Sequence, residues 1–165
     1  MLSSNCKIIF VFHKRKEGIE VNIEFRIMKK KDIPEVINLC NEAFKEQTSL
    51  EYALKTYKKF KKDPNQIYII GILDKKIVAH LKITIIPTIY EPMNTYAILN
   101  HVCVKEDYRR HGFATKMLDV AFDICKKNGC KKVELWSNNV RTAAHACYYN
   151  YGFTLDDAGF FSKEI

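Results

Sequence analysis

The chain has 165 residues, of which 47% are hydrophobic, 12% aromatic and 28% charged. This length and composition fit one folded domain and exclude a disordered or low-complexity protein. The longest apolar run near the start, residues 8–12, is much shorter than the ~20 residues that cross a bilayer, and no secretory signal is recognisable there. We therefore expect a cytoplasmic protein with no membrane partner.

The net charge of +8 is unevenly distributed along the chain. Residues 1–31 hold eight Lys or Arg against three Glu, whereas the other 134 residues hold 19 basic against 16 acidic side chains. A second basic group, Lys55, Lys58, Lys59 and Lys62, follows helical spacing and so shares one helix face. No aromatic side chains are interleaved there to stack on bases, which favours a solvated helix face over a nucleic-acid partner.

Six cysteines are scattered through a chain that is long and apolar enough to fold without disulfides, so reduced thiols are expected. The two closest, Cys125 and Cys130, lack the two-residue gap of a zinc knuckle or redox motif, and no second pair stands near them. The sequence therefore predicts no metal site.

The first 22 residues do not follow a regular pattern. Residues 7–12 fit a short strand, but residues 13–20 read as a charged turn that contains Gly18. We therefore treat residues 1–22 as an N-terminal extension of uncertain structure, and expect the folded domain over residues 23–165.

The domain is expected to begin with a strand and two helices. Alternation of apolar and polar residues over 23–27 predicts a half-buried strand, and a helical stripe follows over 33–44. Thr48 and Glu51 have the spacing of a capping box, which predicts the start of the next helix. Residues 63–65, Asp-Pro-Asn, end that helix.

The rest of the chain alternates strands and helices. The expected strands are 67–73, 76–86, 96–104, 132–137, 153–155 and 160–165, and the expected helices are 113–127 and about 142–150, the latter closed by Gly152. The unit of strand 96–104, helix and strand 132–137 requires a right-handed crossover between parallel neighbours. The fold class is therefore α/β (α+β), a single domain with helices packed on a mixed sheet.

The segment from Val102 to Thr115 carries the most chemical information, because it runs from a strand into a helix. Such a junction exposes unpaired backbone N–H groups at the positive end of the helix dipole. Gly112 lets a ligand approach the chain closely, and Arg109 and Arg110 add positive charge. A diphosphate would fit this cradle. An ordinary turn that needs a glycine for its dihedral angles is the structural alternative.

The pattern Arg109-x-x-Gly112-x-Ala114 closely resembles the Gln/Arg-x-x-Gly-x-Gly/Ala motif of the GNAT superfamily of acetyl-CoA-dependent N-acetyltransferases. Residues 136–153 resemble the family's later half, in which a strand leads to A-x-x-x-Y-x-x-x-G-F. The resemblance covers about residues 23–165. It implies a mixed twisted sheet of six to seven strands with helices on both faces and a central parallel strand pair that splays apart.

The resemblance also implies where acetyl-CoA would bind. The amides of residues 110–115 would hold its pyrophosphate, and the main chain at the end of strand 96–104 would pair with pantetheine. The residues assigned to cosubstrate binding on this basis are Cys103, Val104, Arg109, Arg110, His111, Gly112, Phe113, Ala114, Thr115, Asn138 and Asn139. Tyr148 aligns with the family's usual general acid, which would protonate the departing thiolate; packing on the helix's buried face is the alternative.

The general base is not evident from the sequence. Many relatives place Glu at the position of Asn100, which cannot act as a base at neutral pH. His101 is adjacent, but strand alternation predicts that it faces away if Asn100 faces the substrate. His80, Glu91 and His145 stay open as candidates, each with a structural alternative as a sheet, loop or helix residue.

The expected function is transfer of an acetyl group from acetyl-CoA to a primary amine of a small molecule or peptide, by direct attack in a ternary complex. Cys103 and Cys147 lie near the expected site without a paired base, which argues against an acyl-cysteine route. The rival hypothesis is a non-catalytic acyl-CoA sensor on the same fold. The sequence does not identify the acceptor, and a homodimer stays open.

Overall fold

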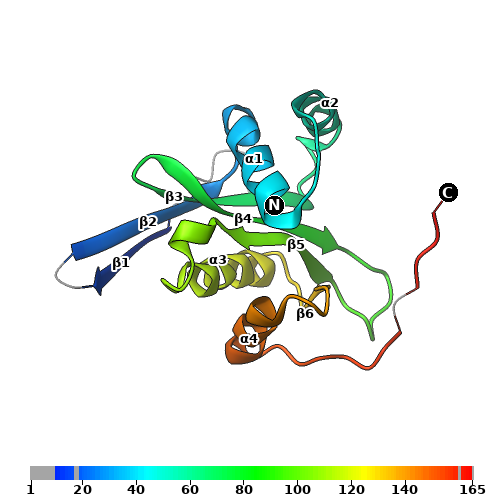
Figure 1. Ribbon diagram of the computed structural model, residues 1–165. Coiled ribbons are helices and arrows are strands. Elements are labelled where there is room, and N and C mark those ends of the chain that lie inside the picture. Colours follow the sequence, from blue (N-terminus) through cyan, green and yellow to red (C-terminus); the bar gives the residue numbers. More distant parts are fainter. Residues whose placement is uncertain (1–9, 17–18, 160, 165) are drawn as a thin grey trace.

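The computed structural model describes residues 10–16, 19–159 and 161–164. Within these residues a six-stranded sheet has the order β1-β2-β3-β4-β5-β6 (Figure 1). Neighbouring strands are antiparallel except for β5 and β6, which are parallel. The strands are β1 Phe10–Lys16, β2 Ile19–Ile27, β3 Gln66–Leu73, β4 Lys76–Ile86, β5 Tyr96–Val104 and β6 Lys132–Leu135.

Helices cover both faces of this sheet, which confirms the expected layer arrangement. In Figure 1, α1 and α2 lie above the sheet, and α3 and α4 lie below it. The helices are α1 Ile33–Phe44, α2 Leu50–Phe60, α3 Phe113–Lys127 and α4 Thr142–Tyr151, with short 3-10 turns η1 Lys30–Asp32 and η2 Glu106–Tyr108. No helix in the described part of the chain is long and apolar enough to span a bilayer.

Two apolar clusters fill the space between the sheet and the helices. The larger joins sheet residues such as Leu81 to Met117 of α3, and the smaller joins sheet residues to Val36 of α1. Successive residues of a strand point to opposite faces, so Ile69 lies in the larger cluster and Ile70 in the smaller. The central strands are therefore apolar on both sides, and they form a rigid base for the site.

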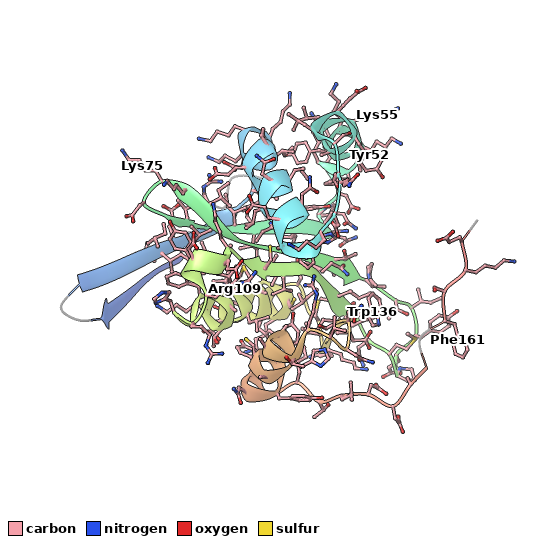
Figure 2. All side chains as sticks on the ribbon, in the orientation of Figure 1. Tyr52, Lys55, Lys75, Arg109, Trp136 and Phe161 are labelled. Carbon is pink, nitrogen blue, oxygen red and sulfur yellow. The ribbon has the colours of Figure 1, made fainter. Side chains whose placement is uncertain are left out.

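The two strands expected near the C-terminus are wrong for the residues that the structure describes. Residues 153–159 and 161–164 form no strand, and Phe160 and Ile165 lie outside the described residues. Phe153 instead packs against Phe122 and Tyr148, with ring centroids 5.7 and 5.8 Å apart. Figure 2 shows Phe161 on a segment that extends away from the body of the molecule. A short apolar run forms a strand only where its backbone can pair with the edge of a sheet.

The charged turn expected over residues 13–20 is also wrong for the described residues, because most of them are strand. β1 pairs with β2 from Phe10↔Phe25 to Lys16↔Ile19. Residues 13–16 and 19–20, for which the sequence suggested a turn, therefore belong to paired strands. Residues 1–9 and 17–18, which include half of the short strand expected at 7–12, lie outside the described residues, and residues 10–12 belong to β1. That the folded domain begins at residue 23, with residues 1–22 as an extension, stays a prediction.

The loop between α1 and α2 is fixed by side-chain hydrogen bonds. The N-cap of α2 is Ser49, whose hydroxyl accepts a hydrogen bond from the amide of Tyr52, and not Thr48 as expected. The Asn41 side chain instead holds Thr48 with two hydrogen bonds of 3.0 Å, one to its carbonyl and one from its amide. Asn41 also accepts the amide of Glu46 through its carbonyl at 3.2 Å. The position of Glu46 is thereby defined.

The basic group on α2 is a solvated face. Lys55, Lys58 and Lys59 of α2 are exposed, and so is Lys62, which lies in the turn after the helix ends at Phe60. In Figure 2, Lys55 projects from the outer side of α2, away from the sheet. The apolar side of the same helix packs against the smaller cluster through residues that include Leu54. This is the arrangement expected from the helical spacing.

Candidate active site

The sheet opens between β5 and β6. The two strands pair in parallel only from Tyr96↔Lys132 to Leu99↔Leu135, where β6 ends. β5 continues to Val104, so its second half has no strand neighbour on that side. The parallel pair expected from the sequence is present, and it separates beyond Leu99↔Leu135, next to the β6 edge of the sheet (Figure 1).

A β-bulge on the other side of β5 distorts the strand at the same level. Along the β4–β5 ladder His80 pairs with Cys103 and Lys82 with Asn100, so Leu81 alone opposes two residues of β5. One of those two, His101, has φ 49°, a left-handed conformation that is uncommon for a residue with a side chain. Such a bulge redirects side chains and is frequent beside active sites.

A cavity of about 290 Å³ lies at the opening. Its walls come from β5, the loop after α1, the segment after β6 and α4. The residues used below that line it are Phe44, Glu46, Asn100, His101, Trp136, Asn138, Arg141 and Tyr148. Figure 2 shows Trp136 beside β6, on the side of the sheet that carries α4. Four chain segments that are distant in sequence therefore meet at the gap in the sheet.

Tyr148 projects from α4 into this cavity and is half-buried. Burial raises the pKa of Tyr148 to about 12. Its ring packs edge-on against Phe153. The phenol is therefore protonated throughout the neutral range, which suits a hydrogen-bond or proton donor and excludes a general base there.

His101 lines the same cavity as Asn100, so the prediction from strand alternation that it faces away is wrong. The bulge and the left-handed φ turn its side chain out of the alternating pattern. Its Nε2 lies 3.4 Å from Oε1 of Glu46, and its ring packs edge-on against Phe44 at 5.1 Å. These contacts fix the imidazole between the loop after α1 and β5.

The other candidate bases lie outside the residues that line the cavity. Nδ1 of His80 is 2.9 Å from the carbonyl of Ile69, to which it must donate, inside the sheet. Burial, the largest cause, lowers the pKa of His80 to about 4. Glu91 is exposed in the loop before β5, and His145 is half-buried on α4. The structure thus favours a structural role for each of these three residues, in the sheet, the loop and the helix respectively.

We expect replacement of His80 by Asn to flatten the dependence of thermal stability on acid pH. In the wild type the unfolded chain binds a proton on His80 near about pH 6.5, and the folded chain only near pH 4, so stability falls as pH is lowered through this window. At about pH 5 this costs about 2 kcal/mol. Asn does not titrate, and its amide can still donate to Ile69. Melting temperatures from about pH 7.5 to 5 check this; parallel curves would contradict it.

The predicted anion cradle lies at the start of α3. Gly112 is the N-cap, with φ 78°, and a Cβ built on it would meet nothing within 4 Å. Phe113 is buried beneath it, and Arg110 also has a left-handed φ of 66°. The space beside Gly112 is therefore open, and the first amides of the helix have no partner within the helix, as an anion site requires. Figure 2 shows Arg109 beside the start of α3.

The end of β5 offers backbone groups to the opening. The amide of Lys105 donates to Val78 of β4 at 2.8 Å, so by the alternation of an antiparallel ladder the N–H and C=O of Val104 face away from β4. Nε of Arg109 donates to that carbonyl at 3.1 Å. Of the two predicted residues, Val104 directs its N–H toward the opening, whereas Cys103 directs its backbone toward β4.

The two asparagines after β6 have different positions. Asn138 lines the cavity and shapes the turn into α4: its Oδ1 accepts the amide of Val140 at 3.1 Å, and its carbonyl accepts the amide of Arg141 at 2.9 Å. Asn139 is exposed and does not belong to the cavity lining. Within the described residues, no three His, Cys, Asp or Glu side chains gather as a metal site would require.

Sequence reasoning missed the contact that closes one wall of the cavity. The guanidinium carbon of Arg141 lies 4.4 Å from the centre of the Phe44 ring, and its Nη2 is 3.4 Å from the carbonyl of Ala43. This cation–π contact joins the start of α4 to the end of α1. No local pattern signals it, because the two residues are far apart in the chain.

The fold and the site define a class of α/β proteins with an opened mixed sheet and a glycine-containing junction between a strand and a helix. The sequence pattern of the Acetyltransferase (GNAT) family matches residues 33–153. The chain therefore belongs to the GNAT acetyltransferase family.

Solved structures with low sequence identity share this fold. A transcriptional regulator from Bacillus halodurans C-125 has a TM-score of 0.79 at 19% identity, covering 86% of this chain and 99% of that one. A glucosamine-6-phosphate N-acetyltransferase from Arabidopsis thaliana has a TM-score of 0.74 at 16% identity, with 86% and 97% covered. A predicted acetyltransferase with acetyl-CoA from Clostridium acetobutylicum has a TM-score of 0.71 at 17% identity, with 86% and 96% covered.

Proposed function

We propose that the protein transfers an acetyl group from acetyl-CoA to a primary amine of a small molecule or peptide, by direct attack in a ternary complex. The observation that carries this proposal is the cavity at the β5–β6 opening, into which Tyr148 projects. Family membership and the Clostridium acetobutylicum relative, which was solved with acetyl-CoA, support the choice of acyl donor.

The residues at the start of α3 fit the pyrophosphate of acetyl-CoA. The left-handed Gly112 leaves space above the first amides of the helix, and Arg109 and Arg110 supply positive charge nearby. We propose that the amides of residues 110–115 hold the pyrophosphate and that the free N–H of Val104 pairs with the pantetheine arm. Asn138 would border the thioester end.

Direct attack is favoured because the nearby thiols lack the features of nucleophiles. Cys103 is buried beside Cys40, and the pKa of Cys40 is raised, first because its thiol donates a hydrogen bond to Cys103 and second because it is buried. A thiol must ionise to attack a thioester, and an apolar environment opposes ionisation. The five described cysteines are free thiols, and we propose that the protein acts in the reducing cytoplasm.

Thiol release from acetyl-CoA, followed with a thiol-reactive dye, tests the proposed function. The acceptor panel contains polyamines, aminoglycosides, amino acids and short peptides, because the cavity does not by itself identify the amine. Turnover with any member is the expected result. Tight binding of acetyl-CoA by calorimetry with no turnover on any amine would favour the acyl-CoA sensor instead.

A further inference from the structure

We propose that His101, held by Glu46, is the base that removes a proton from the ammonium group of the acceptor. This inference rests on the proposed function. An amine is mostly protonated at neutral pH and cannot attack a thioester until it loses that proton. Asn100, which occupies the position of the family's frequent glutamate, cannot accept it.

The backbone holds His101 in an unusual conformation that presents it to the cavity. Its φ of 49° lies in the left-handed region, at the point where the β4–β5 register shifts. Such conformations cost of order 1 kcal/mol or more for a residue with a side chain, and they persist where the surrounding structure imposes them. A regular strand would direct His101 away from the gap, so the bulge brings an ionisable ring into the cavity.

Glu46 selects the proton-accepting atom of the ring. Its Oε1 lies 3.4 Å from Nε2 of His101. On the proposal, Nε2 carries the proton of the neutral imidazole on the side of this carboxylate, and Nδ1 carries the lone pair. Both side chains are about two-fifths exposed, 43% for His101 and 39% for Glu46, and so are accessible from the cavity. The carboxylate also stabilises the imidazolium that forms when Nδ1 takes up a proton.

The proton balance closes with residues of this cavity. Nδ1 of His101 takes one proton from the ammonium group, and the freed lone pair attacks the thioester carbon. The C–N bond forms, the C–S bond breaks, and the leaving sulfur takes the proton of the Tyr148 hydroxyl. The excess proton on the new amide nitrogen returns to the Tyr148 oxygen, and His101 releases its proton to solvent.

Several charged or titratable groups lie near His101, and some of them favour its imidazolium form whereas others oppose it. They are Glu46 from the loop after α1, Arg141 and Tyr148 from α4, and His80 and Lys82 from β4. Glu46 is the only carboxylate among the residues that line the cavity, so it supplies the negative charge that favours the imidazolium. Arg141 opposes it, but its charge also contacts the Phe44 ring.

The decisive experiment is the pH profile of kcat/KM for the wild type, His101→Asn and Glu46→Gln, with the best acceptor from the amine panel. Asn tolerates a left-handed φ better than other residues, so the bulge can survive the change. We expect His101→Asn to lower kcat/KM about 100-fold near neutral pH with unchanged affinity for acetyl-CoA. His145→Asn, a matched change on α4 outside the cavity, should leave the profile unaltered.

The shape of the profile separates catalysis from a structural role. Without a base, only the free amine reacts, so the deficit of His101→Asn should shrink about tenfold per pH unit up to the acceptor's own ionisation. Glu46→Gln should also lower kcat/KM, because the imidazolium that forms on His101 loses its counter-charge. A deficit that is constant across pH, or no deficit, would overturn the proposal. A wild type inactive on every amine would instead refute the proposed function itself.

Discussion

Replacing Tyr148 by Phe should lower kcat by at least about tenfold and leave the affinity for acetyl-CoA within about twofold. The departing sulfur of coenzyme A acquires negative charge as the C–S bond breaks. The buried phenol, whose pKa is raised to about 12, stays protonated and can donate to that charge. Phe fills the same space without the hydroxyl, so the packing against Phe153 is kept.

Tyr149→Phe is the matched control for this prediction. Tyr149 is the next residue of α4, but it is 52% exposed and does not line the cavity. Steady-state kinetics with saturating acetyl-CoA, together with calorimetric binding of coenzyme A, should separate turnover from affinity. Equal kcat values for Tyr148→Phe and the wild type would remove Tyr148 from the mechanism.

Replacing Gly112 by Asp should weaken the binding of coenzyme A by about 100-fold. Gly112 stands at the N-cap of α3, where the space is open and the first amides of the helix have no partner within the helix. A carboxylate there would occupy that space and repel the pyrophosphate, whose negative charge the helix end otherwise favours. Binding by calorimetry at low ionic strength measures the effect, and added salt should reduce it.

Gly129→Asp controls for the backbone cost of this change. Gly129 lies just past the other end of α3, has the same φ of 78°, and would also place a Cβ in open space. Both variants should lose stability in thermal unfolding, because Asp is strained in the left-handed region. The loss should be larger for Gly129→Asp, because its carboxylate lies at the negative end of the helix dipole. Only Gly112→Asp should lose affinity. A similar loss in both variants would argue that the start of α3 is not the pyrophosphate site.

The regular part of the fold could be predicted because its signals are local. The helix over 113–127, the neighbouring strands expected at 67–73 and 76–86 and the helix end at Gly152 each follow from local residues, and the structure contains all of them. The C-terminal strands failed because a run of three to six residues needs a sheet edge to pair with, and no local pattern reports whether one is available.

The site was predictable only in part, for the same physical reason. The glycine at the start of α3 and the cavity position of Tyr148 follow from short motifs, whereas the binding of an anion at Gly112 stays a prediction. The orientation of His101 depends on the register between β4 and β5, which is set by packing across the sheet. The contact of Arg141 with Phe44 needs the whole fold to assemble. Alternation was a sound rule for a regular strand, and a bulge is the irregularity that breaks it.

Four residue pairs join β6, and through it α4, to the rest of the sheet. No residue of α4 is fully buried, so this segment is held by fewer contacts than the central strands. If the proposed function is correct, the acyl donor would lie between the second half of β5 and the segment that follows β6. It would contact both, in the position that a paired strand would otherwise occupy. Substrate binding would then stiffen the segment that carries Tyr148, and loss of the product would loosen it again. Catalysis and the local stability of α4 would then both depend on the short pairing between β5 and β6.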